Sequence, residues 1–163
     1  MELKKDNLLI RYATKNDAEI LCKWWNDGKI MAHAGYPNGI NTTIEKIEKQ
    51  LSEETNETTR RFIIEFNNEP SGEMNYRNKE NKMAEIGIKI CDFNKHEKGY
   101  GTVLLKMFIE YLFYKLDYEN IILDTKLNNK SAQHVYKNIG FIEIGMDENA
   151  IYYELLKKNM ESV

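Results

Sequence analysis

Two glycines stand where a strand-like segment gives way to a long apolar helical segment. Residues 96–102 read His-Glu-Lys-Gly-Tyr-Gly-Thr, between a strand-like run over 84–91 and an apolar run over 103–116. Glycine lets backbone N–H groups approach a bound group closely, so Gly99 and Gly101 favour contact between this loop and a ligand. The first turn of a helix also leaves unpaired N–H donors at the positive end of its dipole. The loop therefore predicts an anion site, and such a site most often holds phosphate.

The spacing of this loop excludes two common nucleotide-binding motifs. A Walker A loop ends in Gly-Lys-Ser or Gly-Lys-Thr, but Thr102 follows Gly101 here with no lysine between them. A dinucleotide fingerprint needs a third glycine three residues after the second, where this chain has Leu104. That fingerprint also belongs to a doubly wound sheet, which the expected order of elements lacks. Another phosphate-bearing ligand is therefore expected.

Apolar periodicity predicts the elements that carry the loop. Alternating or continuous apolar residues predict strands over 7–13, 58–66, 73–77, 83–91, 120–125, 141–145 and 151–156. Helical spacing and capping residues predict helices after Thr14, after Thr42 or Thr43, after the glycine loop and after Asn129. The resulting order is β-α-α-β-β-β-α-β-α-β-β. Because one parallel crossover surrounds the glycine loop and the other pairings are antiparallel, we expect an α+β fold with a mixed, mostly antiparallel central sheet flanked by helices.

Composition and the absence of targeting segments favour a folded protein of the cytoplasm. Its 163 residues are 42% apolar and 11% aromatic, which predicts one compact domain over 1–163. A net charge of −3 argues against nucleic acid as a partner. No segment has the apolar character of a signal peptide or the length of a membrane span. Cys22 and Cys91 lack the spacing of metal ligands, so we expect a reduced, cytoplasmic protein without a disulfide or a metal.

A second motif lies C-terminal to the glycine loop. Residues 129–136 read Asn-Lys-Ser-Ala-Gln-His-Val-Tyr, and Gly-Phe follows at 140–141. Together with 96–101, this pattern resembles the Gcn5-related N-acetyltransferases (GNAT), whose central motif is Arg or Gln, two variable residues, Gly, one variable residue, then Gly or Ala. The predicted element order matches that family from end to end, and the segment 9–27 is most similar to its ribosomal-protein and antibiotic acetyltransferase branch. The one departure is His96, where the family has Arg or Gln.

The resemblance implies a binding site for acetyl-coenzyme A. Its pyrophosphate is expected on the backbone N–H groups of the glycine loop, which are those of Lys98, Gly99, Tyr100, Gly101 and Thr102. The end of the preceding strand, at Ile90 and Cys91, matches the place where the family pairs its backbone with the pantetheine arm. His96 stands at the first motif position, and Asn129 is expected to cap its helix close to the arm. Because the family transfers acetyl directly, Cys91 is expected to be a packed thiol rather than a nucleophile.

The resemblance also implies a proton donor and a base. Tyr136 matches the family tyrosine that protonates the departing coenzyme A thiolate, and a phenol, with a pKa of ~10 against ~8.5 for a thiol, is a plausible donor. An acceptor ammonium with a pKa of ~10.4 must lose a proton before its nitrogen attacks. Glu85, on the strand that carries the cofactor, is the expected base by family position, and Glu73 on the neighbouring strand is the second candidate.

The acceptor is expected to lie against the first helix and the loop that follows it. Trp24, His33 and Tyr36 are the predicted contacts, together with Glu73, whereas Trp25 falls on the inward helical stripe and is expected in the core. The predicted activity is transfer of acetyl to a primary amine of a small molecule or of a protein N-terminus. Homodimers are common in the family, which makes a homodimer possible here, and nothing in the sequence proves one. A non-catalytic acyl-coenzyme A sensor is the alternative function, and a structural or interaction protein is the third hypothesis.

Overall fold

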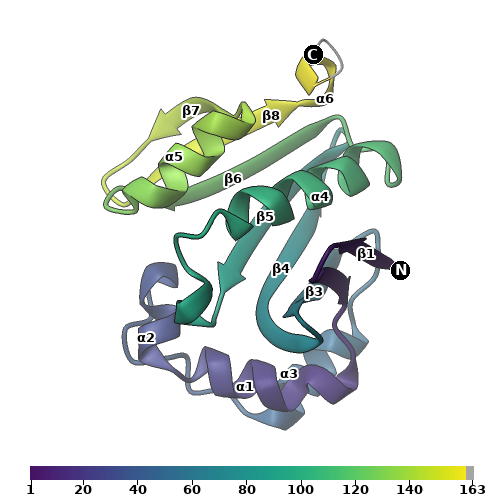
Figure 1. The fold of residues 1–163 in the computed structure, drawn as a ribbon, viewed down its shortest axis with the longest axis vertical. Helices are drawn as coiled ribbons and strands as arrows, with labels where there is room; N and C mark the ends of the chain where they lie inside the picture. Colours follow the sequence, from purple (N-terminus) through teal and green to yellow (C-terminus); the bar gives the residue numbers. More distant parts are fainter. Residues whose placement is uncertain (161–163) are drawn as a thin grey trace.

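The computed structural model describes residues 1–160. Its strands form a single sheet of eight strands (Figure 1). The strand order is β1-β2-β3-β4-β5-β6-β8-β7. The strands are β1 (Glu2–Lys5), β2 (Leu8–Tyr12), β3 (Thr59–Phe66), β4 (Glu69–Lys79), β5 (Met83–Ile90), β6 (Asn120–Lys126), β7 (Ile142–Met146) and β8 (Ala150–Leu156). The helices are α1 (Ala18–Trp25), α2 (Gly28–Met31), α3 (Ile44–Ser52), α4 (Tyr100–Tyr114), α5 (Lys130–Ile139) and α6 (Lys157–Met160). Short 3₁₀ turns are η1 (Lys15–Asp17), η2 (Ala32–Ala34) and η3 (Phe93–Lys95).

The pairing of the strands confirms the predicted fold. Neighbouring strands are antiparallel except β5 and β6, which pair in parallel, and α4 makes the crossover between these two. The strands from β2 to β5 form an antiparallel meander. The chain is therefore α+β with a mixed, mostly antiparallel sheet. The prediction misses β1, α2 and α6, because four residues are too few to show an apolar period.

Polar side chains cap the N-termini of two helices at positions that the sequence predicts. Asn129 Oδ1 accepts a hydrogen bond from the Ala132 N–H at 3.2 Å, at the start of α5. Thr43 Oγ1 accepts one from the Lys46 N–H at 3.3 Å, at the start of α3. Such caps satisfy N–H groups that the first turn leaves without a partner. Capping therefore fixes the residues at which α3 and α5 begin.

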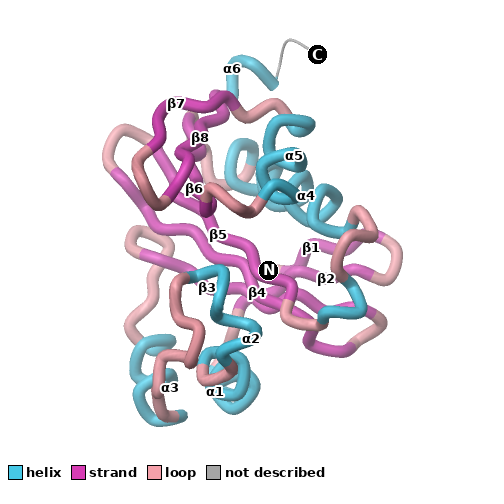
Figure 2. The backbone as a smooth tube through the Cα atoms, turned by 90° about the vertical axis from the view of Figure 1, so that its left-hand side faces the viewer, coloured by secondary structure: helices cyan, strands magenta, loops and turns pink. Residues whose placement is uncertain are grey.

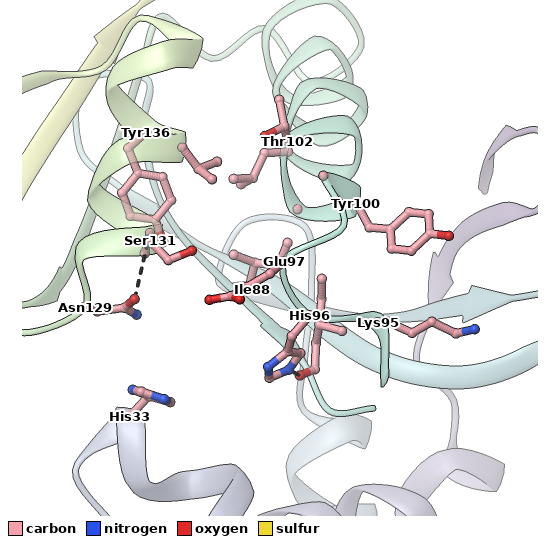
Figure 3. Close-up of a pocket in the computed structure, with 16 residues that line it drawn as sticks. His33, Ile88, Lys95, His96, Glu97, Tyr100, Thr102, Asn129, Ser131 and Tyr136 are labelled. Atoms are coloured by element: carbon pink, nitrogen blue, oxygen red, sulfur yellow. Dashed lines mark hydrogen bonds between the residues drawn. The ribbon is translucent and has the colours of Figure 1, made fainter. Parts of the chain in front are cut away.

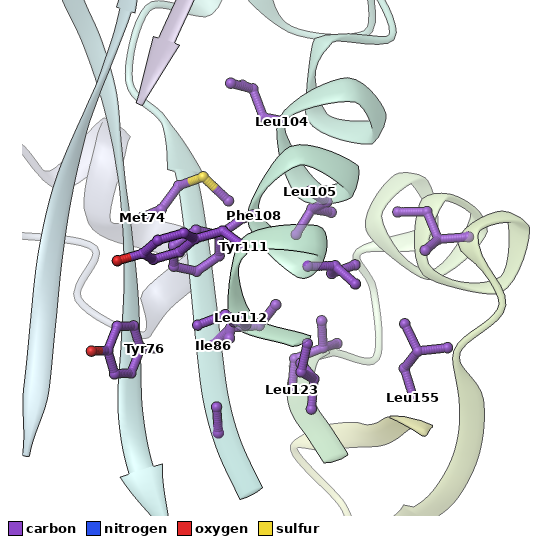
Figure 4. Close-up of a cluster of buried hydrophobic side chains, with 14 of the residues drawn as sticks. Met74, Tyr76, Ile86, Leu104, Leu105, Phe108, Tyr111, Leu112, Leu123 and Leu155 are labelled. Atoms are coloured by element: carbon purple, nitrogen blue, oxygen red, sulfur yellow. The ribbon is translucent and has the colours of Figure 1, made fainter. Parts of the chain in front are cut away.

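Helices lie on both faces of the sheet (Figure 2), and a hydrophobic cluster lies on each face. On one face, α4 and α5 cover the larger cluster, in which Phe108 and Leu112 are fully buried (Figure 4). On the other face, α1 and α3 cover a smaller cluster that contains Leu21, Ile47 and Ile63. Successive residues of a strand point to opposite faces, which is why β3 contributes to both clusters. Because α4 contacts both β5 and α5, it is buried around most of its circumference, as its sequence predicts.

The strands β5 and β6 pair over a short stretch and then separate. Their last pair joins Glu85 to Ile122. Beyond it, β5 continues to Ile90 and β6 continues to Lys126 without further pairing between the two strands. We call the space between 86–90 and 123–126 the β5–β6 opening. It leaves backbone groups on both strands free to meet a ligand.

The segment formed by α2 and η2 lies across the far end of the β5–β6 opening. On the β5 side, Lys89 Nζ is 3.0 Å from Met31 Sδ. On the β6 side, Lys126 Nζ donates to the Ala32 carbonyl at 3.2 Å. Two contacts from different strands therefore hold this segment in place beside the opening.

Candidate active site

A cavity of about 350 Å³ lies at the β5–β6 opening, where the glycine loop meets α5 (Figure 3). Its walls come from the end of β5, the loop between η3 and α4, the first turns of α4 and α5, and η2. The lining residues are His33, Ile88, Ile90, Lys95, His96, Glu97, Gly99, Tyr100, Gly101, Thr102, Leu105, Asn129, Ser131, Ala132, Val135 and Tyr136. The two motifs found in the sequence therefore line one cavity.

The glycine loop presents N–H donors to this cavity. Gly99 has a φ of +81°, a left-handed conformation that glycine adopts without strain. The Val103 N–H donates to the Gly99 carbonyl at 3.4 Å, so the N–H groups of Tyr100, Gly101 and Thr102 precede the first hydrogen-bonded donor of the helix. A Cβ atom at Gly101 would meet no atom within 4 Å, which shows open space beside these donors. Free donors, the helix dipole and open space together fit a pyrophosphate group.

The side chains of the loop contribute less than its backbone. Lys95 and Glu97 line the cavity, one with each sign of charge, whereas Lys98 is exposed and lies outside the lining. The Tyr100 ring turns away from Tyr136 (Figure 3) and packs edge-on against Phe66, with ring centroids 4.7 Å apart. Tyr100 therefore faces the cavity through its backbone, as the sequence predicts for the whole loop.

His96 contacts the strand end that the sequence assigns to the pantetheine arm. Its Nε2 lies 2.6 Å from the Ile90 carbonyl oxygen. The neighbouring Cys91 N–H donates to the Ser71 carbonyl at 2.7 Å, on the β4 side. Because successive backbone groups of a strand point to opposite sides, the N–H and C=O of Ile90 face the β5–β6 opening. Ile90 is thus the strand-end residue whose backbone is directed at the cavity, and His96 is the partner of its carbonyl.

The Cys91 thiol is packed inside the protein. It is 6% exposed within the smaller hydrophobic cluster, and its Sγ lies 3.9 Å from the Lys89 carbonyl oxygen. Burial, followed by the charge of Glu73, raises the pKa of this thiol well above its usual range. Since the thiolate is the nucleophilic form of cysteine, these surroundings support the expected packing role.

Tyr136 lines the cavity with a ring that is almost fully buried. It is 8% exposed and packs against Phe141 and Tyr153, whose ring centroids lie 5.9 and 5.7 Å away. Its hydroxyl has no hydrogen-bond partner within the part of the chain that the structure describes. Burial, followed by the charges of Asp124 and Tyr153, raises the pKa of Tyr136 to about 12. The phenol therefore keeps its proton at neutral pH, as a proton donor must.

Glu85 lies beside the opening but outside the cavity. Its side chain points to the face of β5 opposite to that of the cavity-lining Ile88 and Ile90. Its Oε1 is 3.4 Å from Arg77 Nη1, and its side chain is 35% exposed. The register places Glu85 at the last β5–β6 pair. Its assignment as the base stays a prediction.

Glu73 is buried beneath α1 and has partners for both carboxylate oxygens. Trp25 Nε1 donates to Oε2 at 2.6 Å, and Arg61 forms an ion pair with Oε1. The Arg61 guanidinium also lies 4.7 Å from the centre of the Trp25 ring. These contacts join α1 to β3 and β4, which favours a role in holding the helix. Contact between Glu73 and an acceptor stays a prediction.

Of the predicted acceptor contacts, only His33 lines the cavity. It comes from η2 and lies on the Asn129 side (Figure 3). Trp24 is 6% exposed in the smaller hydrophobic cluster, because α3 packs beside α1 and covers that flank. Tyr36 is 51% exposed and lies outside the cavity lining. Trp25 is buried, as its position on the helical stripe predicts.

A family model described as the Acetyltransferase (GNAT) domain matches residues 7–142. The chain belongs to this family. Acetyl-coenzyme A is the cosubstrate of the family, and the N–H donors of the glycine loop fit its pyrophosphate. The resemblance drawn from the two motifs is thereby confirmed.

Two curated relatives match parts of this GNAT chain. N-alpha-acetyltransferase 30 from Xenopus laevis is 37% identical over 57 residues, which are 35% of this chain and 20% of that protein. The putative ribosomal N-acetyltransferase YdaF from Bacillus subtilis (strain 168) is 30% identical over 91 residues, which are 50% of this chain and 49% of that protein. The match thus spans half or less of each relative's length.

Solved structures share the fold over nearly the whole chain. A spermidine N-acetyltransferase from Vibrio cholerae, in complex with CoA and spermine, has a TM-score of 0.82 at 21% identity and covers 94% of this chain and 98% of its own. The aminoglycoside acetyltransferase AAC(6')-Ib, in complex with coenzyme A, has a TM-score of 0.79 at 21% identity and covers 96% of this chain and 98% of its own. These likenesses show the GNAT fold.

Sequence reasoning missed Asp124 beside this site. It follows the buried run Ile121-Ile122-Leu123 on β6 and is exposed on the sheet face opposite α4. Desolvation by burial, followed by the negative charges of Glu85 and Asp147, raises the pKa of the Asp124 carboxyl. A charged residue that interrupts an apolar strand was the available signal. Its proximity to Tyr136 depends on tertiary structure.

Two further findings concern metal binding and membrane spans. Across residues 1–160, no group of three or more His, Cys, Asp or Glu side chains is placed to hold a metal ion. Within the same range, no helix has the length and apolar character needed to cross a membrane.

Proposed function

We propose that this protein transfers the acetyl group of acetyl-coenzyme A directly to a primary amine of a small molecule or of a protein N-terminus. One observation carries the proposal: a single cavity is lined both by the N–H donors of the glycine loop and by the protonated phenol of Tyr136. The donors suit a pyrophosphate, and the phenol suits a leaving thiolate. Either feature alone would support only binding.

Different residues of the cavity bind different parts of the cosubstrate. The N–H groups of residues 98–102 bind the pyrophosphate, and the backbone of Ile90 pairs with the pantetheine arm. The Ile90 carbonyl oxygen has two lone pairs, so it can accept from the pantetheine arm while His96 Nε2 occupies the other. Asn129 caps α5 and so fixes the helix that carries Tyr136.

Acetyl-coenzyme A supplies the acetyl group as a thioester, and the chain supplies protons and polar groups around it. The Ile90 N–H faces the opening and stabilises negative charge on the carbonyl oxygen. Tyr136 gives its proton to the departing sulfur. A carboxylate at the opening, for which Glu85 is the candidate from family position, takes a proton from the acceptor.

Names of the related proteins support an amine as the acceptor. One structural neighbour is a spermidine N-acetyltransferase and another is an aminoglycoside acetyltransferase, while the sequence relatives are named for N-alpha and ribosomal acetylation. These substrates share an amino group and little else. They support the reaction class and leave the particular amine to experiment.

A non-catalytic acyl-coenzyme A sensor is the second candidate, and two contacts favour it. His96, which stands where the family has Arg or Gln, contacts the Ile90 carbonyl oxygen. Glu85 is paired with Arg77, whose Nη1 lies 3.4 Å from its Oε1. A sensor would bind coenzyme A without turning over any amine.

Thiol release separates the two candidates. The protein is incubated with acetyl-coenzyme A and one of three acceptors, which are spermidine, kanamycin and a tetrapeptide with a free N-terminus, and acetylated product is identified by mass. Turnover of any acceptor supports the transferase. Tight binding of coenzyme A by calorimetry without turnover supports the sensor.

A tyrosine pair gives a matched control. Tyr136→Phe is expected to lower kcat by about 10²- to 10⁴-fold, the usual range for one proton-transfer group, while coenzyme A binding is retained. Tyr153→Phe removes the hydroxyl of a ring that packs against Tyr136 but lies outside the cavity lining, so kcat is expected to stay near that of the wild type. Equal turnover by wild type and Tyr136→Phe would remove Tyr136 from the mechanism.

The cytoplasm is the proposed location, supported by two cysteines that are both free thiols. A homodimer stays part of the proposal on family resemblance alone. Light scattering of the purified protein measures the mass directly, and a monomeric mass across the concentrations used for the assay would remove the dimer.

A further inference from the structure

The glycine loop places one carboxylate inside the cavity that it offers to an anion. Glu97 lies between His96, whose ring contacts the end of β5, and the N–H donors that begin at Lys98. It lines the cavity, and Figure 3 shows its carboxylate pointing away from the loop, toward the side formed by Asn129 and Ser131. A negative side chain therefore shares the space that the sequence assigns to a negatively charged ligand.

The backbone of Glu97 has a conformation that residues other than glycine rarely adopt. Its φ is +57°, in the left-handed region, and Gly99 has a φ of +81°. A residue with a Cβ atom is strained in this region, because Cβ approaches a neighbouring carbonyl oxygen. Among residues 1–160, every other residue with a Cβ atom and a positive φ is Asn or Asp, apart from Lys82. The loop therefore carries a glutamate at position 97 in spite of backbone strain.

The Glu97 carboxylate has no counter-charge in the described part of the chain. Across residues 1–160, its side chain forms no salt bridge and no hydrogen bond. Lys95 also lines the cavity, but its Nζ lies 5.6 Å from the centre of the Phe66 ring, and Figure 3 shows it extending away from Glu97. Lys98 is exposed and lies outside the lining. The negative charge of Glu97 is therefore not neutralised within the cavity.

Glu97 and a bound pyrophosphate would carry like charge in one cavity of about 350 Å³. The N–H donors and the helix dipole attract the Glu97 carboxylate in the same way as they attract a ligand. Two negative groups at these donors repel each other. Because the Glu97 side chain is exposed and has no partner within residues 1–160, it is able to turn to solvent when a ligand enters.

We propose that Glu97 is a built-in competitor of the coenzyme A pyrophosphate and thereby sets the affinity of the cosubstrate site. In the free protein its carboxylate lies in the cavity, and coenzyme A displaces it to reach the N–H donors. The displaced carboxylate stays near the bound pyrophosphate, because Glu97 directly precedes the donors in the chain. The repulsion weakens binding of acetyl-coenzyme A and of the coenzyme A product alike, so the product leaves faster.

This inference rests on the proposed placement of the pyrophosphate on the glycine loop. It does not depend on acetyl transfer, so it applies to a transferase and to a sensor. Binding of coenzyme A, measured by calorimetry on the whole protein, is therefore sufficient to test it.

Glu97→Gln removes the charge and leaves the backbone strain in place. Its Kd for coenzyme A should be lower than that of the wild type by about fivefold or more, the scale of one pair of like charges about 4 Å apart in water. Asp6→Asn is the matched control, because Asp6 is also exposed with a φ of +55° but lies in the β1–β2 turn, outside the cavity lining. Its Kd should equal that of the wild type. A Kd for Glu97→Gln that is equal to or above the wild-type value would overturn the inference.

The dependence of binding on salt tests the repulsion itself. The Debye length falls from about 10 Å at 0.1 M salt to about 3 Å at 1 M. The ratio between the Kd values of wild type and Glu97→Gln should therefore shrink toward one as salt rises. A ratio that stays constant over this range would show an effect of side-chain shape, and the electrostatic role of Glu97 would be wrong.

Glu97→Gly separates the charge from the backbone. Glycine adopts the left-handed conformation freely, so the Tm of this variant should equal or exceed that of the wild type. Its Kd for coenzyme A should fall as it does in Glu97→Gln. Tighter binding in Glu97→Gly alone would assign the effect to the backbone and would overturn the role of the carboxylate.

A fourth variant distinguishes failure of this inference from failure of the pyrophosphate placement. Gly101→Val fills the open space beside the N–H donors and so tests whether the pyrophosphate lies there. If Gly101→Val weakens coenzyme A binding and Glu97→Gln leaves it unchanged, the placement stands and the inference is wrong. If Gly101→Val binds coenzyme A as the wild type does, the placement fails and the inference fails with it.

Discussion

Replacing Glu73 by glutamine is expected to lower the melting temperature without changing how the amine binds. Glu73 is 4% exposed, and its carboxylate joins Trp25 of α1 to Arg61 of β3. Glutamine keeps an oxygen for the Trp25 N–H but removes the charge that neutralises Arg61, whose side chain is 16% exposed. The substitution therefore leaves a largely buried guanidinium without its counter-charge.

The size of the effect follows from this burial. Removing one partner of a buried ion pair costs about 3–5 kcal/mol. For a chain of this length, 1 kcal/mol corresponds to a shift of about 2–4 °C in Tm. Because glutamine retains one hydrogen bond, the lower part of the range applies, and we expect Tm to fall by about 6–12 °C.

Thermal unfolding followed by circular dichroism measures this shift. Asp117→Asn is the matched control, because it removes a carboxylate from an exposed pair with Lys82, whose side chains are 69% and 55% exposed. The Tm of Asp117→Asn should equal that of the wild type. A double replacement, Arg61→Met with Glu73→Leu, should recover part of the loss, since it leaves no unpaired buried charge.

One outcome would refute the reasoning. If Glu73→Gln has the Tm of the wild type and a higher KM for the amine, the Glu73 carboxylate binds the acceptor. The prediction drawn from the sequence would then be correct, and the contacts with Trp25 and Arg61 would carry little stability. A lower Tm with an unchanged KM would instead support a role for Glu73 in holding α1 against the sheet.

Three further predictions concern the cavity and the buried phenol and thiol. Gly101→Val places a side chain in the open space of the glycine loop, so coenzyme A binding measured by calorimetry should weaken by tenfold or more while Tm stays within about 3 °C of wild type. Tyr136 has a raised pKa of about 12, so above pH ~10 the unfolded chain releases a proton that the folded chain keeps, and stability should fall by up to about 2–3 kcal/mol between pH ~10 and ~12. Urea unfolding at alkaline pH should show a shallower fall in Tyr136→Phe, and equal slopes would contradict this assignment. Cys91 should resist a thiol reagent that modifies Cys22, and Cys91→Ser should keep its turnover; loss of turnover with an unchanged Tm would make the thiol functional.

Local chemistry makes the cofactor side of the molecule predictable. The left-handed Gly99, the cap at Asn129 and the apolar run of α4 each depend on residues close in sequence. Propensity and periodicity therefore locate them within a few residues. The same holds for Tyr136, because its position on α5 follows from the cap. Both motifs that line the cavity are therefore visible in short windows of the sequence.

The acceptor side depends on contacts between distant segments. The helical stripe of α1 runs through Trp25 and so predicts a pocket position for Trp24, but packing of α3 against α1 buries both rings. The partners of Glu73 come from 48 residues upstream for Trp25 and 12 for Arg61. The place of Asp124 depends on where β5 and β6 stop pairing. None of these relations has a signature within a short window of sequence.

The division of the hydrophobic core by the sheet has a consequence for how this protein can change. The glycine loop, α4 and α5 rest on the larger cluster, while α1 and α3 rest on the smaller one. Substitutions well separated in space and without shared partners have nearly additive effects. The helices of the smaller cluster can therefore be redesigned for a new acceptor, one substitution at a time. The glycine loop, α4 and α5 on the other face should keep their stability. Libraries confined to 18–52 are the ones from which altered acceptor preference should be recovered.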